Sequence, residues 1–150
     1  HLFLMLGAAL APPILGFIAD KNSARTVIIA LMAMTFVSFY ALLVLVVLPD
    51  VLLFSLLFFL GACLGSIPPL CWSLGSVFVP SARGLVSAFL MGFVWIVSEG
   101  CGILTSGVLS SLFTDDAPAK ALSIMGAILI LGMYYSLKLP SDETQTITLD

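Results

Sequence analysis

Long apolar runs alternate with short polar or turn-forming segments along this chain. A helix needs about 20 mostly apolar residues to cross a bilayer, and the chain has room for five such runs. The polar breaks fall at 20–25, 49–50, 80–83 and 114–118. The pattern predicts an all-α integral membrane fold with five transmembrane helices, at residues 2–19, 26–48, 51–79, 84–113 and 119–137, and a polar tail at 140–150.

The composition supports this prediction. Of the 150 residues, 61% are hydrophobic and only 9% are charged, and the mean hydropathy is +1.25. A soluble domain carries about 25% charged residues, so an ordinary water-soluble fold is excluded. No basic run gives an electrostatic footprint for nucleic acid. The chain starts within apolar sequence at His1, without Met or a signal peptide, and we expect a fragment of a longer protein.

Glu99 is the charged residue that lies deep inside an apolar run, near the middle of 84–113. A carboxylate at bilayer depth is costly, and such residues mark functional sites by default. Burial favours the neutral form, so Glu99 is a candidate for proton coupling or substrate binding. The alternative is a protonated or hydrogen-bonded carboxyl at a contact between helices.

Three of the predicted helices carry the features of an interior position. Residues 2–19, 51–79 and 84–113 hold the proline pairs, most of the glycines and both tryptophans, whereas 26–48 and 119–137 are almost uniformly aliphatic and aromatic. Irregular backbone at membrane depth is tolerated where it is buried or lines a cavity. Trp72, Ser76 and Trp95 are therefore candidates for lining a cavity for a small amphipathic ligand, with plain packing as the alternative for the tryptophans.

The proline pairs Pro12-Pro13 and Pro68-Pro69 remove helix hydrogen bonds and are predicted to kink their helices. Gly61 and Gly65, four residues apart, and the small residues of 2–19 favour close helix packing. The three cysteines have no metal-ligand spacing, and no metal or other cofactor is expected. An intramembrane enzyme is disfavoured, since no serine has a histidine partner within the membrane.

The basic residues predict the orientation. The segments that hold Lys21, Arg25, Arg83 and Lys138 fall on one face if five spans alternate, and the other face has only Lys120. The positive-inside rule assigns the first face to the cytoplasm. The tail at 140–150 is then cytoplasmic, and the cell (inner or plasma) membrane is the expected location.

The segment 16–25 resembles the G-x-x-x-D-[R/K]-x-G-R-[R/K] loop of the major facilitator superfamily. Gly16, Asp20, Lys21 and Arg25 match that motif, as does Ala19, while Ser23 and Ala24 depart from it. The degraded motif and the polar tail resemble helices eight to twelve of that fold. The stretch 80–91 is loosely similar to the fosmidomycin-resistance efflux branch.

This resemblance implies part of a twelve-helix bundle that lacks its N-terminal half and seventh helix. It implies a secondary active transporter of a small solute, working by alternating access, in which this fragment alone is not competent. The reading of Glu99 as a proton-coupling carboxyl adds H⁺ as the expected coupling ion. It implies a gating loop at Gly16, Asp20, Lys21 and Arg25, with Arg83 nearby; a solvated loop and a positive-inside anchor are the respective alternatives. The competing function is a non-transporting membrane scaffold or a channel subunit.

Overall fold

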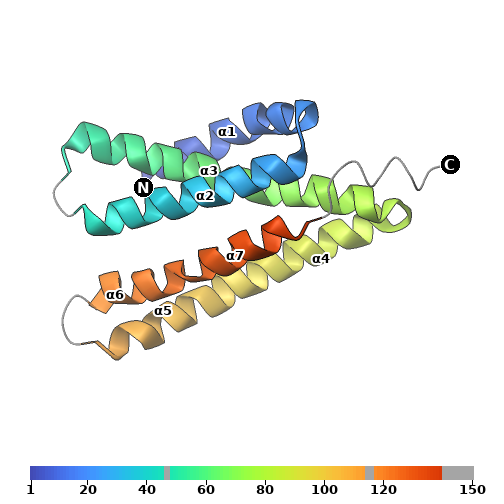
Figure 1. The fold of residues 1–150 in the computed structure, drawn as a ribbon. Coiled ribbons are helices and arrows are strands. Elements are labelled where there is room, and N and C mark those ends of the chain that lie inside the picture. Colours follow the sequence, from blue (N-terminus) through green and yellow to red (C-terminus); the bar gives the residue numbers. More distant parts are fainter. Residues whose placement is uncertain (46–47, 114–116, 140–150) are drawn as a thin grey trace. The chain divides into compact units, whose positions relative to one another are not determined.

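The computed structural model describes residues 1–45, 48–113 and 117–139, and of Trp95, Ser98, Glu99 and Ala117 it describes only the backbone. Its regular elements are all helical (Figure 1), which confirms the all-α prediction. In chain order they are α1 (Leu2–Lys21), α2 (Ala24–Val44), α3 (Asp50–Phe78), the short 3₁₀ helix η1 (Pro80–Ala82), α4 (Arg83–Trp95), the π-helix η2 (Ile96–Cys101), α5 (Gly102–Ser111), α6 (Ala117–Gly126) and α7 (Ile128–Leu137).

Four helical stretches are long and apolar enough to cross a membrane. They are Leu2–Lys21, Ala24–Val44, Asp50–Phe78 and Pro118–Leu137. The fifth predicted span, 84–113, consists of two shorter apolar helices on either side of η2. The count of five spans therefore stays a prediction. Many large apolar side chains of these helices are exposed, which suits contact with lipid rather than water.

The chain divides into two compact units. Unit 1 contains residues 1–71 and the segment that starts at Leu129, and unit 2 is Trp72–Ile128. Each unit is described by itself.

In unit 1, α1 and α3 approach each other through glycines. A Cβ on Gly7 would overlap the main-chain carbonyl of Phe58, and a Cβ on Gly61 would overlap that of Leu4. A Cβ on Gly65 would lie 2.6 Å from the Cα of Ala8. The close-packing role predicted for Gly61 and Gly65 is thus confirmed, because only glycine permits this backbone approach.

Helix α2 also contributes buried side chains to unit 1, although its sequence lacks the prolines, glycines and tryptophans that marked the predicted interior helices. It packs on α1. The terminal methyl of its Met32 lies 2.6 Å from the position that a Cβ on Gly132 of α7 would occupy. Its buried residues are Val27, Ile28, Leu31, Thr35 and Ser38.

In unit 2, the end of α3 turns through η1 into α4, and α5 lies beside α6 (Figure 1). Gly75 faces α4, with Cγ1 of Val86 at 3.1 Å and Cδ1 of Leu90 at 3.2 Å from the position of a Cβ. The ammonium of Lys120 lies 5.8 Å from the ring centre of Phe113. These contacts make a hairpin at each end of the α4–η2–α5 segment.

The helices differ from the predicted spans mainly at their ends. The polar segment 20–25 is not an open loop: α1 continues to Lys21 and α2 starts at Ala24, which leaves only Asn22 and Ser23 between them. Polar side chains at a helix end are solvated without ending the helix, and no Gly or Pro stands here to stop it. The predicted span 119–137 is interrupted at Ala127, between α6 and α7.

Candidate functional site

Glu99 lies in the six-residue π-helix η2, Ile96–Cys101. A π-helix replaces i→i+4 hydrogen bonds by i→i+5 bonds, and such segments occur as short bulges within α-helices, frequently at functional sites. The sequence pattern missed this feature, because hydropathy does not distinguish the two hydrogen-bond ladders. Gly100 and Gly102 are the available signal, since glycine weakens an α-helix at this point.

The π-helix also changes which residues of this segment share a face. The periodicity of an ideal α-helix places Ser98, Gly102, Ser106 and Ser110 on one stripe, but η2 interrupts that periodicity after Trp95. The side chains of Trp95 and Glu99, both predicted to contact a cavity, lie outside the described part of the chain. Apart from the neighbouring residues and the local helix backbone, no described heavy atom lies within 4 Å of a Cβ placed on Gly92, Gly100 or Gly107.

Trp72 and Ser76 lie near the end of α3, where both are partly exposed. The Ser76 hydroxyl donates a hydrogen bond to the carbonyl of Ser73 at 2.7 Å, within its own helix. Beside them, a surface groove between α3 and α4 is lined only by apolar residues: Gly75, Phe78, Val79, Leu85, Val86, Phe89 and Leu90. None of these residues was a sequence candidate, and the groove holds neither Trp72 nor Ser76.

The residues of the predicted gating loop occupy two helix ends. Asp20 and Lys21 lie in the last turn of α1, where both are exposed and the Lys21 ammonium lies 4.4 Å from the ring centre of Phe17. Gly16 is partly exposed, and a Cβ placed on it would meet no described heavy atom within 4 Å beyond the neighbouring residues and the local helix backbone. Arg25 lies in the first turn of α2, with its side chain partly exposed.

Arg25 has a partner within this chain. Its Nη2 donates a hydrogen bond to the main-chain carbonyl of Leu137, at 2.6 Å, at the end of α7. The last carbonyls of a helix lack intrahelical partners and carry partial negative charge, so a guanidinium stabilises them. Lys138, which directly follows Leu137, has its ammonium 4.5 Å from the ring centre of Tyr134.

The remaining candidates are placed as follows. Arg83 is exposed at the first position of α4. Pro12 and Pro13 lie inside α1, and Pro68 and Pro69 lie inside α3; both helices continue through their proline pair without ending. The kinks stay a prediction. The tail 140–150 lies outside the described residues.

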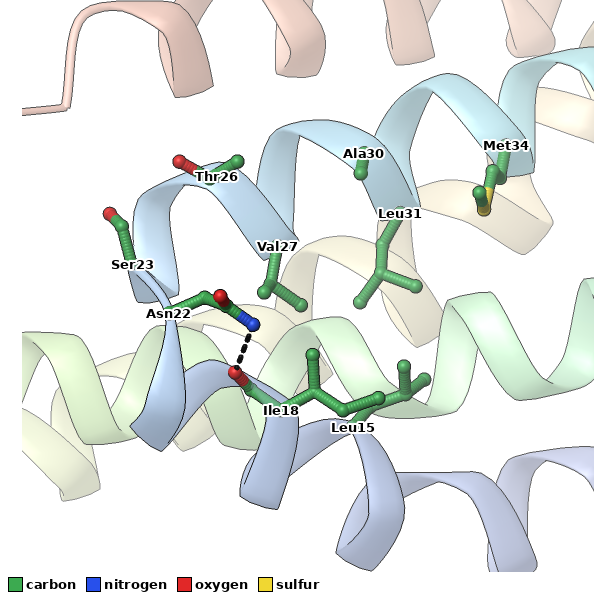
Figure 2. Close-up of a pocket in the computed structure, with 9 residues that line it drawn as sticks. All are labelled: Leu15, Ile18, Asn22, Ser23, Thr26, Val27, Ala30, Leu31 and Met34. Carbon is green, nitrogen blue, oxygen red and sulfur yellow. Dashed lines mark hydrogen bonds between the residues drawn. The ribbon is translucent and has the colours of Figure 1, made fainter.

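A second groove lies between α1 and α2 (Figure 2). Its lining is contributed by the end of α1, the connection and the first half of α2: Leu15, Ile18, Asn22, Ser23, Thr26, Val27, Ala30, Leu31 and Met34. The amide nitrogen of Asn22 donates a hydrogen bond to the carbonyl of Ile18 at 3.0 Å, which closes the end of α1 at the mouth of the groove. No sequence candidate lines this groove, because nothing in the apolar pattern of either helix marks a gap between them.

The described residues contain no group of three or more His, Cys, Asp or Glu side chains placed to hold a metal ion. Cys63, Cys71 and Cys101 are free thiols. The described geometry offers apolar grooves, helix-end charges and a π-helix.

The described residues form an all-α structure in which four helical stretches are long and apolar enough to cross a membrane. Comparison with protein-family models, with curated proteins and with solved structures found no match to this chain.

Proposed function

We propose that this chain is part of a secondary active transporter of the major facilitator type, which moves a small solute across the cell membrane by alternating access, coupled to H⁺. The observation that carries the proposal is the position of Glu99: a single carboxyl deep within an apolar stretch, in the π-helical segment Ile96–Cys101. Intramembrane carboxyls and π-bulges are both concentrated at functional sites.

Glu99 is the proton carrier in this proposal. The carboxyl takes up a proton from one side of the membrane and becomes neutral. Neutralisation lowers the free-energy cost of keeping this group in apolar surroundings. When the protein opens to the other side, water solvates the carboxylate and the proton is released. The solute site, for which Trp72, Ser76 and Trp95 are candidates, is exposed to alternate sides in the same cycle.

The helix-end charges support a gating role for 16–25. Three charged side chains of the segment that resembles the superfamily loop lie at one end of unit 1: Asp20, Lys21 and Arg25. Gly16 is the fourth residue that matches the motif. The open space at each of Gly92, Gly100 and Gly107 leaves room for further helices to pack on this segment. In the proposal these are supplied by an N-terminal half and a seventh helix of the same protein.

The test is transport by the full-length protein in proteoliposomes that contain a pH-sensitive dye. A panel of sugars, amino acids, organic anions and amphipathic cations is offered with and without a pH gradient. We expect at least one solute to exchange and to move with protons. Glu99→Gln should keep solute exchange but abolish accumulation driven by the pH gradient. Asp50→Asn, a carboxyl change at the exposed start of α3, should alter neither.

Two results would count against the proposal. Accumulation by Glu99→Gln that still follows the pH gradient would remove the carrier role from this residue. Failure of every solute to exchange, with ion currents across a planar bilayer, would identify a channel subunit, and failure of both would favour a scaffold.

A further inference from the structure

Most of the residues that line the groove between α1 and α2 are apolar. Its floor is formed by Val27 and Leu31, which are 9% and 4% exposed. Its sides are formed by Leu15 and Ile18 from α1 and by Met34 from α2, and the side chains from the two helices face one another across it (Figure 2). Such a surface binds a hydrocarbon chain more favourably than a polar ligand.

The groove is polar at one end only. Asn22 and Ser23 form the connection between the helices, and Thr26 lies in the first turn of α2 (Figure 2). From Ser23 to Met34 the helix rises by about 16 Å at the usual 1.5 Å per residue. The hydrocarbon of one bilayer leaflet is about 15 Å thick. A molecule with a polar head and one extended acyl chain therefore matches both the polarity and the length of the groove.

The charges at the polar end favour a negative head group. Lys21 directly precedes Asn22 and is exposed, and Arg25 follows Ser23 by two positions. The hydrogen bond from Arg25 to Leu137 brings the end of α7, and with it Lys138, to the same end of unit 1. Among the residues that the structure describes, three basic residues thus accompany one acidic residue, Asp20, at this end.

We propose that the α1–α2 groove binds one phospholipid with an anionic head group. One acyl chain lies along Val27 and Leu31, and the phosphate lies at Asn22 and Ser23, beside Lys21. The exposed ammonium of Lys21 supplies a charge-assisted hydrogen bond to the phosphate. This inference concerns a different part of the chain from Glu99 and does not depend on transport.

The test is native mass spectrometry of the full-length protein, purified in a mild detergent and titrated with phosphatidylglycerol or with phosphatidylcholine of the same acyl chains. A basic side chain beside an anionic head group contributes about a fivefold preference. We expect at least that preference for phosphatidylglycerol, its loss in Lys21→Gln and its retention in Lys21→Arg. Lys120→Gln, the same charge change on α6 of unit 2, should leave the preference unchanged.

A second pair of variants tests the groove itself. Ala30→Trp places an indole in the groove and should reduce binding of both lipids, whereas Ala9→Trp, at an exposed alanine of α1 outside the groove, should not. Circular dichroism checks that each variant keeps its helices. Met34→Trp, farther along the groove, replaces Ala30→Trp if that variant unfolds.

Three outcomes would overturn the proposal. Equal binding of the two lipids, unchanged in Lys21→Gln, would remove the head-group preference. Undiminished binding in both Ala30→Trp and Met34→Trp would place the lipid elsewhere. A wild-type dimer in light scattering that Ala30→Trp dissociates, without an effect on lipid, would assign the groove to a second copy of the protein.

Discussion

The guanidinium of Arg25 donates a hydrogen bond to the carbonyl of Leu137, 112 positions away in the chain. This bond joins the first turn of α2 to the end of α7 within unit 1. Lys138 and Leu139 close the last turn with hydrogen bonds to the carbonyls of Tyr135 and Ser136, so the Leu137 carbonyl is one that the helix itself leaves open.

Replacement of Arg25 by alanine should loosen the end of α7. A hydrogen bond from a charged group is worth about 1.5–3 kcal/mol when shielded from water, and because this side chain is partly exposed we expect a loss of about 1 kcal/mol. Hydrogen–deuterium exchange should rise in the last turn of α7, and the midpoint of thermal unfolding in detergent should fall. Arg83→Ala is the matched control, since Arg83 is exposed at the start of a helix, where a positive charge is not stabilising. Equal effects of the two variants would contradict the role of the Arg25 bond.

Gly61→Ala should destabilise the contact between α1 and α3. The added Cβ meets the backbone of Leu4, which cannot move without shifting α1, and overpacking of this kind costs about 1–3 kcal/mol. The measurement is the free energy of unfolding in mixed micelles.

Two other glycines provide controls for that result. Gly132→Ala should cost much less, because its Cβ meets the terminal methyl of Met32, at the end of a flexible side chain. Gly16→Ala, with open space around its Cβ, should stabilise α1 by about 0.5–1 kcal/mol. A Gly61→Ala variant as stable as Gly16→Ala would refute the close approach of α1 and α3.

Thr35→Val should leave stability unchanged or raise it. The Thr35 side chain is fully buried at 0% exposure, and its Oγ1 has no hydrogen-bond partner in the described structure. A buried hydroxyl without a partner costs about 1–3 kcal/mol, and valine has nearly the same shape. Thr35→Ser keeps the hydroxyl and loses a methyl group, so it should be less stable by about 1 kcal/mol. The midpoint of thermal unfolding in the same detergent should be highest or unchanged for Thr35→Val and lowest for Thr35→Ser, relative to the wild type. A Thr35→Val protein less stable than Thr35→Ser would contradict a hydroxyl buried without a partner.

The three thiols should react in the order of their exposure. Cys101 is exposed, Cys71 is intermediate and Cys63 is buried. N-ethylmaleimide reacts with the thiolate, which forms where water reaches the sulfur, so for the protein in detergent at pH 8 we expect labelling of Cys101 first, then Cys71, then Cys63. Peptide mass spectrometry at successive times gives the order, and Cys101→Ser identifies the fast phase. Faster labelling of Cys63 than of Cys101 would contradict the burial of Cys63 on α3.

The helical class and the close-packing role of Gly61 and Gly65 followed from the sequence, whereas their partner, α1, came from the structure. Apolar runs interrupted by polar segments determine helices of this length, and Gly61 and Gly65 marked the contact face. The Arg25–Leu137 bond did not follow, because a main-chain carbonyl has no signature in the sequence. The groove between α1 and α2 was not predicted for a related reason. Its presence depends on how side chains such as Leu15 and Leu31 fit together across the two helices, and the sequence of each helix alone predicts only an apolar face.

The π-helix at Ile96–Cys101 is the other feature that periodicity did not predict. Each i→i+5 hydrogen bond of a π-helix encloses one residue more than an i→i+4 bond of an α-helix. Insertion of a single residue into a regular α-helix would produce the same arrangement. Each residue of an α-helix corresponds to about 100° of rotation. If the extra residue moves along the segment, the side chains that it passes turn by about that angle, while α4 and α5 keep their own hydrogen bonds. Glu99 therefore lies at a point where a side chain can be redirected by rewinding a few hydrogen bonds instead of by moving a whole helix.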